Sequence, residues 1–204
     1  MSSTSADVVA SLAGWRLPSS LQTIEIRECG ELLSLSEGVD RWPCSNLKTL
    51  DILSCPKLFA RQWNLGMLTS LTSLTIGGVD AERLVSFPEE ERQLPTSFTL
   101  TRCPELQCLP EDGMPASLTH LELYDLPNLK SLNANTFRRL TTLQNLSIAF
   151  CTQLRCLPEE RLLASLSMLH INGYPLNKRC QKNKGRDWEK IKHIPNIFID
   201  SKRL

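Results

Sequence analysis

Apolar residues recur along this chain in one short phrase. A leucine is followed three residues later by a leucine or isoleucine, two residues later by another, and most often by a cysteine three residues after that. Seven copies follow one another in one register, and their first positions lie 26, 24, 24, 23, 25 and 23 residues apart. Such a fixed period is the mark of a repeat protein. The copies begin at Leu21, Leu47, Leu71, Pro95, Leu118, Leu143 and Leu166.

The spacing within the phrase predicts a strand. Its second and third apolar positions are two residues apart, so they point to the same side of an extended chain, and the residues between them point outward. One such strand cannot bury its apolar side alone, so successive copies must stack. The sequence therefore predicts an α/β solenoid: a leucine-rich-repeat horseshoe with a parallel concave sheet of about seven short strands. Its convex side should be mostly irregular or short-helical, because prolines follow several of the strands.

Local irregularities add finer expectations. The segments Thr136–Leu140 and Pro158–Ala164 are predicted as brief helices on the convex side. Pro95 replaces the expected leucine, which predicts a weak or irregular fourth strand. We expect a poorly ordered tail at 1–16, repeats over 17–176, and a capping segment at 177–204. In that segment, a helical turn over Asp187–Lys192 should lay Trp188 and Ile191 over the last repeat, and Ile197 and Ile199 should add a final strand.

The cysteines fit the repeat better than they fit a metal site. No pair has zinc-ligand spacing, and Cys103/Cys108 and Cys151/Cys156 occupy two copies of one phrase. At Cys29, Cys55, Cys103 and Cys151, which follow strands, we expect a buried ladder of small side chains, and a valine or leucine fills the same interior slot in other copies. Tyr174 closes the seventh copy of the phrase. All eight cysteines are expected to be reduced thiols, and no cofactor is expected.

Charge and hydropathy exclude several partners. The formal net charge is +1, from 23 basic and 22 acidic side chains, so nothing favours nucleic acid. A basic run at 178–184 is interpreted as a solvated surface, because uncharged residues interrupt it. No apolar run is long enough for a membrane span, and the N-terminus lacks the features of a signal peptide. The expected location is cytoplasmic, with the nucleus possible.

At this point the residues resemble a known family. Phrases such as RCPELQCLPE and FCTQLRCLPE look like the C-terminal leucine-rich repeats of plant nucleotide-binding disease-resistance proteins. The ending, from Pro175 through Trp188 to Asp200, resembles the terminal segment of their coiled-coil class. This resemblance implies a module of a plant innate-immune receptor. It would contact a pathogen effector, a guarded host protein or an upstream receptor domain. The phosphate loop of such receptors does not occur in this chain, so nucleotide binding is not carried over.

Outward strand positions define the predicted binding face, and the expected function is protein recognition without catalysis. A cluster of Tyr124 and Phe150 with His120 or His170 is the best candidate contact, because exposed aromatic side chains can anchor a protein partner. The alternative is that Phe150 packs into the following turn. The histidines carry no catalytic phrase with them. The full set of candidate contact residues is Glu25, Arg27, Asp51, His120, Glu122, Tyr124, Phe150 and His170.

A second function stays open at the level of the sequence. Substrate adaptors of ubiquitin ligases also use such repeat arrays. That reading needs an F-box-like helical segment, and 1–20 is too short to contain one.

Overall fold

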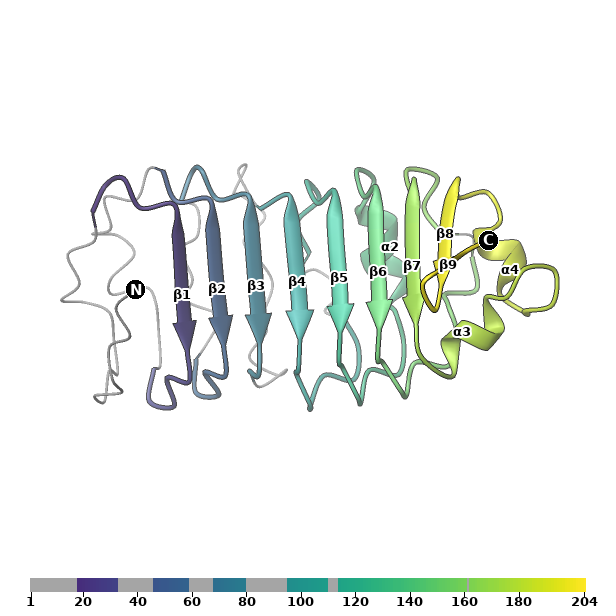
Figure 1. The fold of residues 1–204 in the computed structure, drawn as a ribbon, viewed down its shortest axis with the longest axis horizontal. Helices are drawn as coiled ribbons and strands as arrows, with labels where there is room; N and C mark the ends of the chain where they lie inside the picture. The colour runs from purple at the N-terminus through teal and green to yellow at the C-terminus, as the bar shows by residue number, and fades with distance from the viewer. Residues whose placement is uncertain (1–17, 33–45, 59–67, 80–94, 110–113, 161) are drawn as a thin grey trace.

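A computed structural model describes residues 18–32, 46–58, 68–79, 95–109, 114–160 and 162–204 of the chain. One nine-stranded sheet runs through these residues, and its strands lie side by side in chain order (Figure 1). Strands β1 to β8 pair in parallel, and β9 pairs with β8 in the antiparallel direction. The strands are β1 (Thr23–Arg27), β2 (Thr49–Leu53), β3 (Ser73–Gly77), β4 (Ser97–Thr101), β5 (His120–Tyr124), β6 (Asn145–Ala149), β7 (Met168–Asn172), β8 (Asn196–Ile199) and β9 (Lys202–Arg203).

The seven predicted strands form in their predicted register, which confirms the leucine-rich-repeat solenoid. In each of β1 to β7 the second and fourth residues are buried, as the phrase requires. Leu50 pairs with Leu74 and Leu74 with Phe98, and all three are at most 1% exposed. Stacking thus converts single apolar stripes into one continuous core.

Pro95 does not disturb its strand, so the expected weakness of the fourth repeat is wrong. Strand β4 has the same length and the same pairing as its neighbours. Proline lacks a backbone N–H, but at this position that N–H makes no bond between strands. At the matching position of other repeats, as in Leu71 and Leu118, the N–H donates to a carbonyl three residues earlier in the same repeat. A proline there costs a local turn bond and leaves the bonds between strands intact.

Side-chain hydroxyl groups at the residues before β3, β4, β5 and β7 tie adjacent repeats together at the strand entry. The hydroxyl of Thr72 donates to the carbonyl of Lys48, that of Thr96 to Thr72, and that of Thr119 to Thr96. Ser167 repeats the contact with Gln144 further along. Each bond joins equivalent positions of adjacent repeats, so these bonds fix the register from outside the core.

The opposite side of the sheet carries little helix. Helix α2 (Ala134–Arg139) confirms the prediction over Thr136–Leu140 to within two residues, and it lies behind the strands in Figure 1. The side chain of Asn133 caps its first turn. Within Pro158–Ala164 the described residues form no helix, so that prediction is wrong.

The C-terminal segment covers the end of the array with α3 (Leu176–Arg179), α4 (Trp188–Ile191) and the β8–β9 hairpin. Ile191 is fully buried and Trp188 packs against the core, as predicted. Strand β8 is the predicted final strand, while β9 was not predicted. The predicted tail at 1–16 lies outside the described residues. None of the helices among the described residues is long and apolar enough to cross a membrane.

One buried carboxylate holds this cap together. Asp187 is 1% exposed and lies between Arg179 and Lys190, with N···O distances of 2.9 Å to each. Asp187 also accepts a hydrogen bond from the backbone N–H of Leu157, which lies thirty residues earlier, in the sixth repeat. Burial opposes the charged form, but these three donors outweigh it and lower the pKa of Asp187.

Candidate functional site

Alternate residues of β1 to β8 form one solvent-facing surface, here called the open face. Register aligns its middle positions in one row across the strands. Adjacent members of a row lie about 4.8 Å apart, the spacing of neighbouring strands. The row reads Glu25, Asp51, Thr75, Thr99, Glu122, Ser147, His170 and Phe198.

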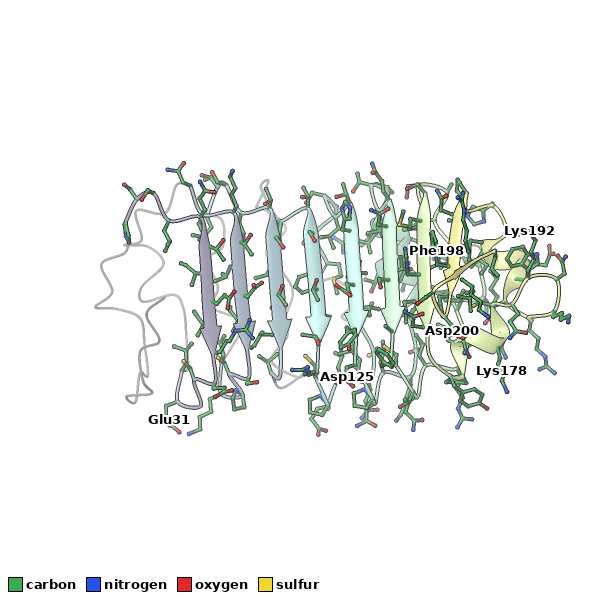
Figure 2. All side chains as sticks on the ribbon, in the orientation of Figure 1. Glu31, Asp125, Lys178, Lys192, Phe198 and Asp200 are labelled. Carbon is green, nitrogen blue, oxygen red and sulfur yellow. The ribbon has the colours of Figure 1, made fainter. Side chains whose placement is uncertain are left out.

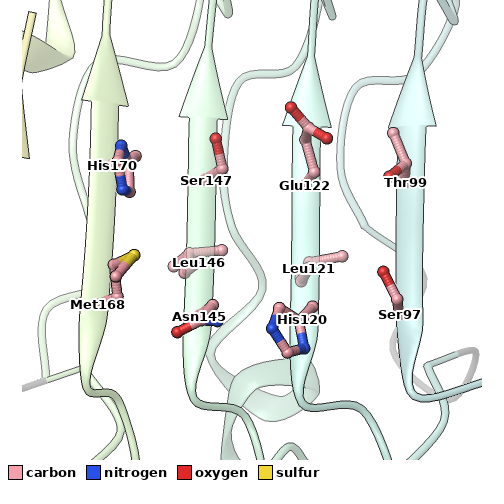
Figure 3. A pocket seen from close by; sticks show the side chains of 10 residues that line it. All are labelled: Ser97, Thr99, His120, Leu121, Glu122, Asn145, Leu146, Ser147, Met168 and His170. Atoms are coloured by element: carbon pink, nitrogen blue, oxygen red, sulfur yellow. The ribbon is translucent and has the colours of Figure 1, made fainter. Parts of the chain in front are cut away.

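Three of the predicted residues line a depression of about 350 Å³ across β4 to β7 (Figure 3). His120, Glu122 and His170 share it with small polar side chains such as Thr99 and Ser147. His120 lies 2.8 Å from the hydroxyl of Thr119. Glu122 has no ion-pair or hydrogen-bond partner among the described residues, so its carboxylate is available to a ligand.

His170 has a different neighbour from the one the sequence suggested. Its ring stacks on Phe198 of β8, with centroids 4.5 Å apart and planes 11° apart. Phe198 was not among the predicted site residues, because only the alignment of β8 with β7 reveals that it faces outward. The histidine therefore closes the depression on the side of the cap.

Tyr124 and Phe150 form a separate aromatic pair where the strands end. Their rings meet edge to face, with centroids 5.4 Å apart and planes at 80°. Phe150 is 50% exposed and Tyr124 is 36% exposed, so Phe150 does not pack away into the following turn. His120 is four residues from Tyr124 along β5, about 13 Å at the rise of a strand. Neither histidine thus joins the aromatic pair.

Phe150 belongs to a column of left-handed backbone that the sequence did not reveal. The residue after every strand from β1 to β8 has a positive φ. The column contains Glu28, Ser54, Gly78, Arg102, Asp125, Phe150, Gly173 and Asp200. Glycine suits this conformation, but the column also holds acidic, basic and aromatic residues, so residue type gives no consistent signal. For a residue with a side chain, the conformation costs about 1–2 kcal/mol.

The remaining predicted residues lie at the other end of the sheet. Glu25 and Arg27, both on β1, pair with each other at 3.0 Å. Asp51 lies beside Glu25 in register and is partly exposed. These residues share the open face with the depression but stand three or more strands away from Glu122.

Most of the predicted cysteine ladder is buried. Cys55, Cys103 and Cys151 are buried, and each thiol lies 3.4–3.5 Å from the carbonyl oxygen two residues earlier, to which it donates. Burial raises the pKa of Cys55 and of Cys151 to about 11, so neither is a thiolate nucleophile near neutral pH. Cys29, in the first repeat, is only partly buried, which differs from the prediction.

Tyr174, which closes the seventh copy of the phrase, is 66% exposed. Its ring lies beneath the ammonium group of Lys178, at 5.3 Å.

The described residues contain no group of three or more histidine, cysteine or acidic side chains placed to hold a metal ion. Comparison of the chain with protein-family models and with curated proteins found no match.

Proposed function

We propose that this chain is a non-catalytic protein-recognition module of a plant innate-immune receptor, acting in the cytoplasm through the open face of β4 to β8. The plant-receptor part of this proposal rests on the resemblance of the repeat phrases and of the terminal segment. The recognition part rests on the surface itself. Its partner would be a pathogen effector, a guarded host protein or an upstream receptor domain.

The exposure of Phe150 is the main observation behind the recognition proposal. Half of its side chain is exposed, and its φ of 56° is unfavourable for a bulky residue. Its contribution to folding is limited to the buried half of its side chain, worth about 1 kcal/mol, and to the edge contact with Tyr124, worth about 0.5–1.5 kcal/mol. Exposed, rigid aromatic side chains are common anchors of protein interfaces because they bury a large area at small entropic cost.

The depression beside the pair adds the polar side chains of His120 and Glu122 to such an interface. Glu122 precedes Tyr124 by two residues on the same face, so a partner can contact both at once. Interfaces commonly combine a central apolar anchor with a polar surround. The open face offers both within two strands.

The test is an interaction screen of this chain against candidate effectors, host proteins and the upstream domains of receptors with the same repeats. The variant Tyr124→Ser/Phe150→Asn removes the aromatic pair, and asparagine tolerates the left-handed backbone. Leu204→Ser is the matched control, because Leu204 has a similar exposed fraction but lies outside the open face. We expect proteins that bind the unaltered chain to bind the control as well and to bind the double variant weakly or not at all. Partners that bind all three chains equally would contradict the proposal.

A further inference from the structure

A strong charge asymmetry separates the cap from the rest of the chain. Residues 177–204 contain nine lysines and arginines and three acidic residues, a formal charge of +6. The whole chain carries +1, so residues 1–176 carry −5. The near-neutral total therefore conceals a concentrated basic region, which is an electrostatic attractant for acidic partners.

The charge of +6 already includes the three acidic residues of the cap, and each of these residues has partners elsewhere in the cap or in the last repeat. Asp187 is buried between Arg179 and Lys190. Glu189 pairs with Lys192. Asp200 accepts hydrogen bonds from the backbone of Gly173 and from the side chain of Asn177.

Four cations remain on one short segment, here called the basic cap surface: Lys178, Lys182, Lys184 and Arg186. All four are exposed, and none has an ion-pair partner among the described residues. Lys178 lies at the end of the solenoid in Figure 2, and the loop from α3 to α4 projects from that end in Figure 1.

The loop from α3 to α4, which carries Lys182, Lys184 and Arg186, is held in a fixed shape. The N–H groups of Lys184 and Gly185 both donate to the carbonyl of Gln181. The N–H of Asp187 donates to the carbonyl of Arg179. Gly185 lies so close to that carbonyl that a Cβ atom there would be 1.9 Å from its oxygen. The cations are therefore presented from an ordered backbone, which reduces the entropic cost of binding.

We propose that the basic cap surface binds an acidic protein segment, at a site distinct from the open face. Carboxylates need only point charges opposite them, and three exposed cations on the loop, with Lys178 on α3 beside it, supply these. The surface fits nucleic acid poorly. Helices α3 and α4 have four residues each, which is too short to fill a DNA groove. The exposed aromatic beside the loop, Tyr174, already has Lys178 over its ring, and single strands require free stacking platforms.

The experiment measures binding of a fluorescent twelve-residue polyglutamate peptide to the whole chain by anisotropy. The test variant is Lys182→Ser/Lys184→Ser/Arg186→Ser. The matched control, Lys48→Ser/Lys130→Ser/Arg155→Ser, removes the same formal charge from exposed positions in the repeats. Both variants are checked for an unchanged far-ultraviolet circular dichroism spectrum.

We expect the cap variant to bind the peptide at least about tenfold more weakly and the control about as well as the unaltered chain, with affinity falling as salt rises. Equal losses in both variants would show that net charge alone is responsible and would overturn the proposal. Absence of binding at low salt would overturn it as well. Tighter binding of a twelve-nucleotide oligothymidylate than of the peptide would assign the surface to nucleic acid instead.

Discussion

Replacing Asp187 by asparagine should loosen the cap while leaving the repeats before it folded. The substitution keeps the size of the side chain but removes the charge that Arg179 and Lys190 share. Hydrogen bonds to charged groups contribute about 1.5–3 kcal/mol each. Arg179 is 34% exposed and can regain water, whereas Lys190 is only 19% exposed and keeps only the carbonyl of Leu157 in place of its ion-pair partner. We therefore expect a loss of about 3–4 kcal/mol, within the range for breaking a buried ion pair.

Hydrogen exchange followed by mass spectrometry can locate this loss. A change of 3–4 kcal/mol corresponds to roughly a 100- to 1000-fold faster exchange where opening is local. The acceleration should appear in peptides that cover Leu157 and Ile191, and it should be small in β2 to β4. The control is Glu160→Gln, because Glu160 pairs with Arg138 on the exposed surface. Exchange in the cap of the Asp187 variant that matches this control would refute the reasoning.

Acid should reproduce part of the same effect. The pKa of Asp187 is lower in the folded chain than in the unfolded chain. The stabilisation is thus fully present above the unfolded value, about 3.9, and is lost as pH falls through the lower folded value. In the Asp187→Asn variant this contribution to the acid dependence of exchange should be missing.

Three further predictions concern the backbone and the thiols. Phe150→Asn should lower the free energy of unfolding in urea by less than about 2 kcal/mol, because relief of the left-handed backbone offsets much of the lost ring contact and apolar burial; a larger loss would show that Phe150 is structural. Gly185→Ala should destabilise the cap strongly, since its Cβ would overlap the carbonyl of Arg179, and an unchanged thermal midpoint would contradict the geometry. Of the described thiols, exposed Cys108 and Cys156 should react with iodoacetamide at pH 8 well before buried Cys180, whose pKa burial raises to about 12; equal rates by peptide mapping would count against the packing.

The sequence predicts the strands well because each is encoded locally. The phrase that contains Leu50 and Ile52 repeats often enough to set both the period of the strand and its partner. Even Pro95 does not break it, because the proline falls before the strand and not within it. The two brief helices predicted on the convex side lack such a repeated phrase, and only one of them forms, as α2 with Asn133 at its cap.

The features that the sequence did not reveal depend on contacts between distant residues. Asp187 reaches Leu157 across thirty positions, and no local pattern marks that pairing. Phe198 faces His170 only because β8 continues the parallel register. Phe150 gives no hint of its backbone conformation, since the residues at equivalent positions share no chemistry. The basic run at 178–184 is visible in the sequence, but the hydrogen bonds that order the loop around it are not.

Because the strand register is unbroken, the side chains in the middle row of the open face are evenly spaced. Moving from one repeat to the next shifts a middle-row side chain by one strand spacing, about 4.8 Å, whatever the length of chain between the strands. Repeats of 23 to 26 residues therefore keep the same spacing between middle-row side chains. Duplication of the repeat between Glu122 and His170 would add one interval between them and leave every other interval unchanged. A partner with its own fixed spacing would then distinguish the two versions by distance alone, with no change in the chemistry of either residue.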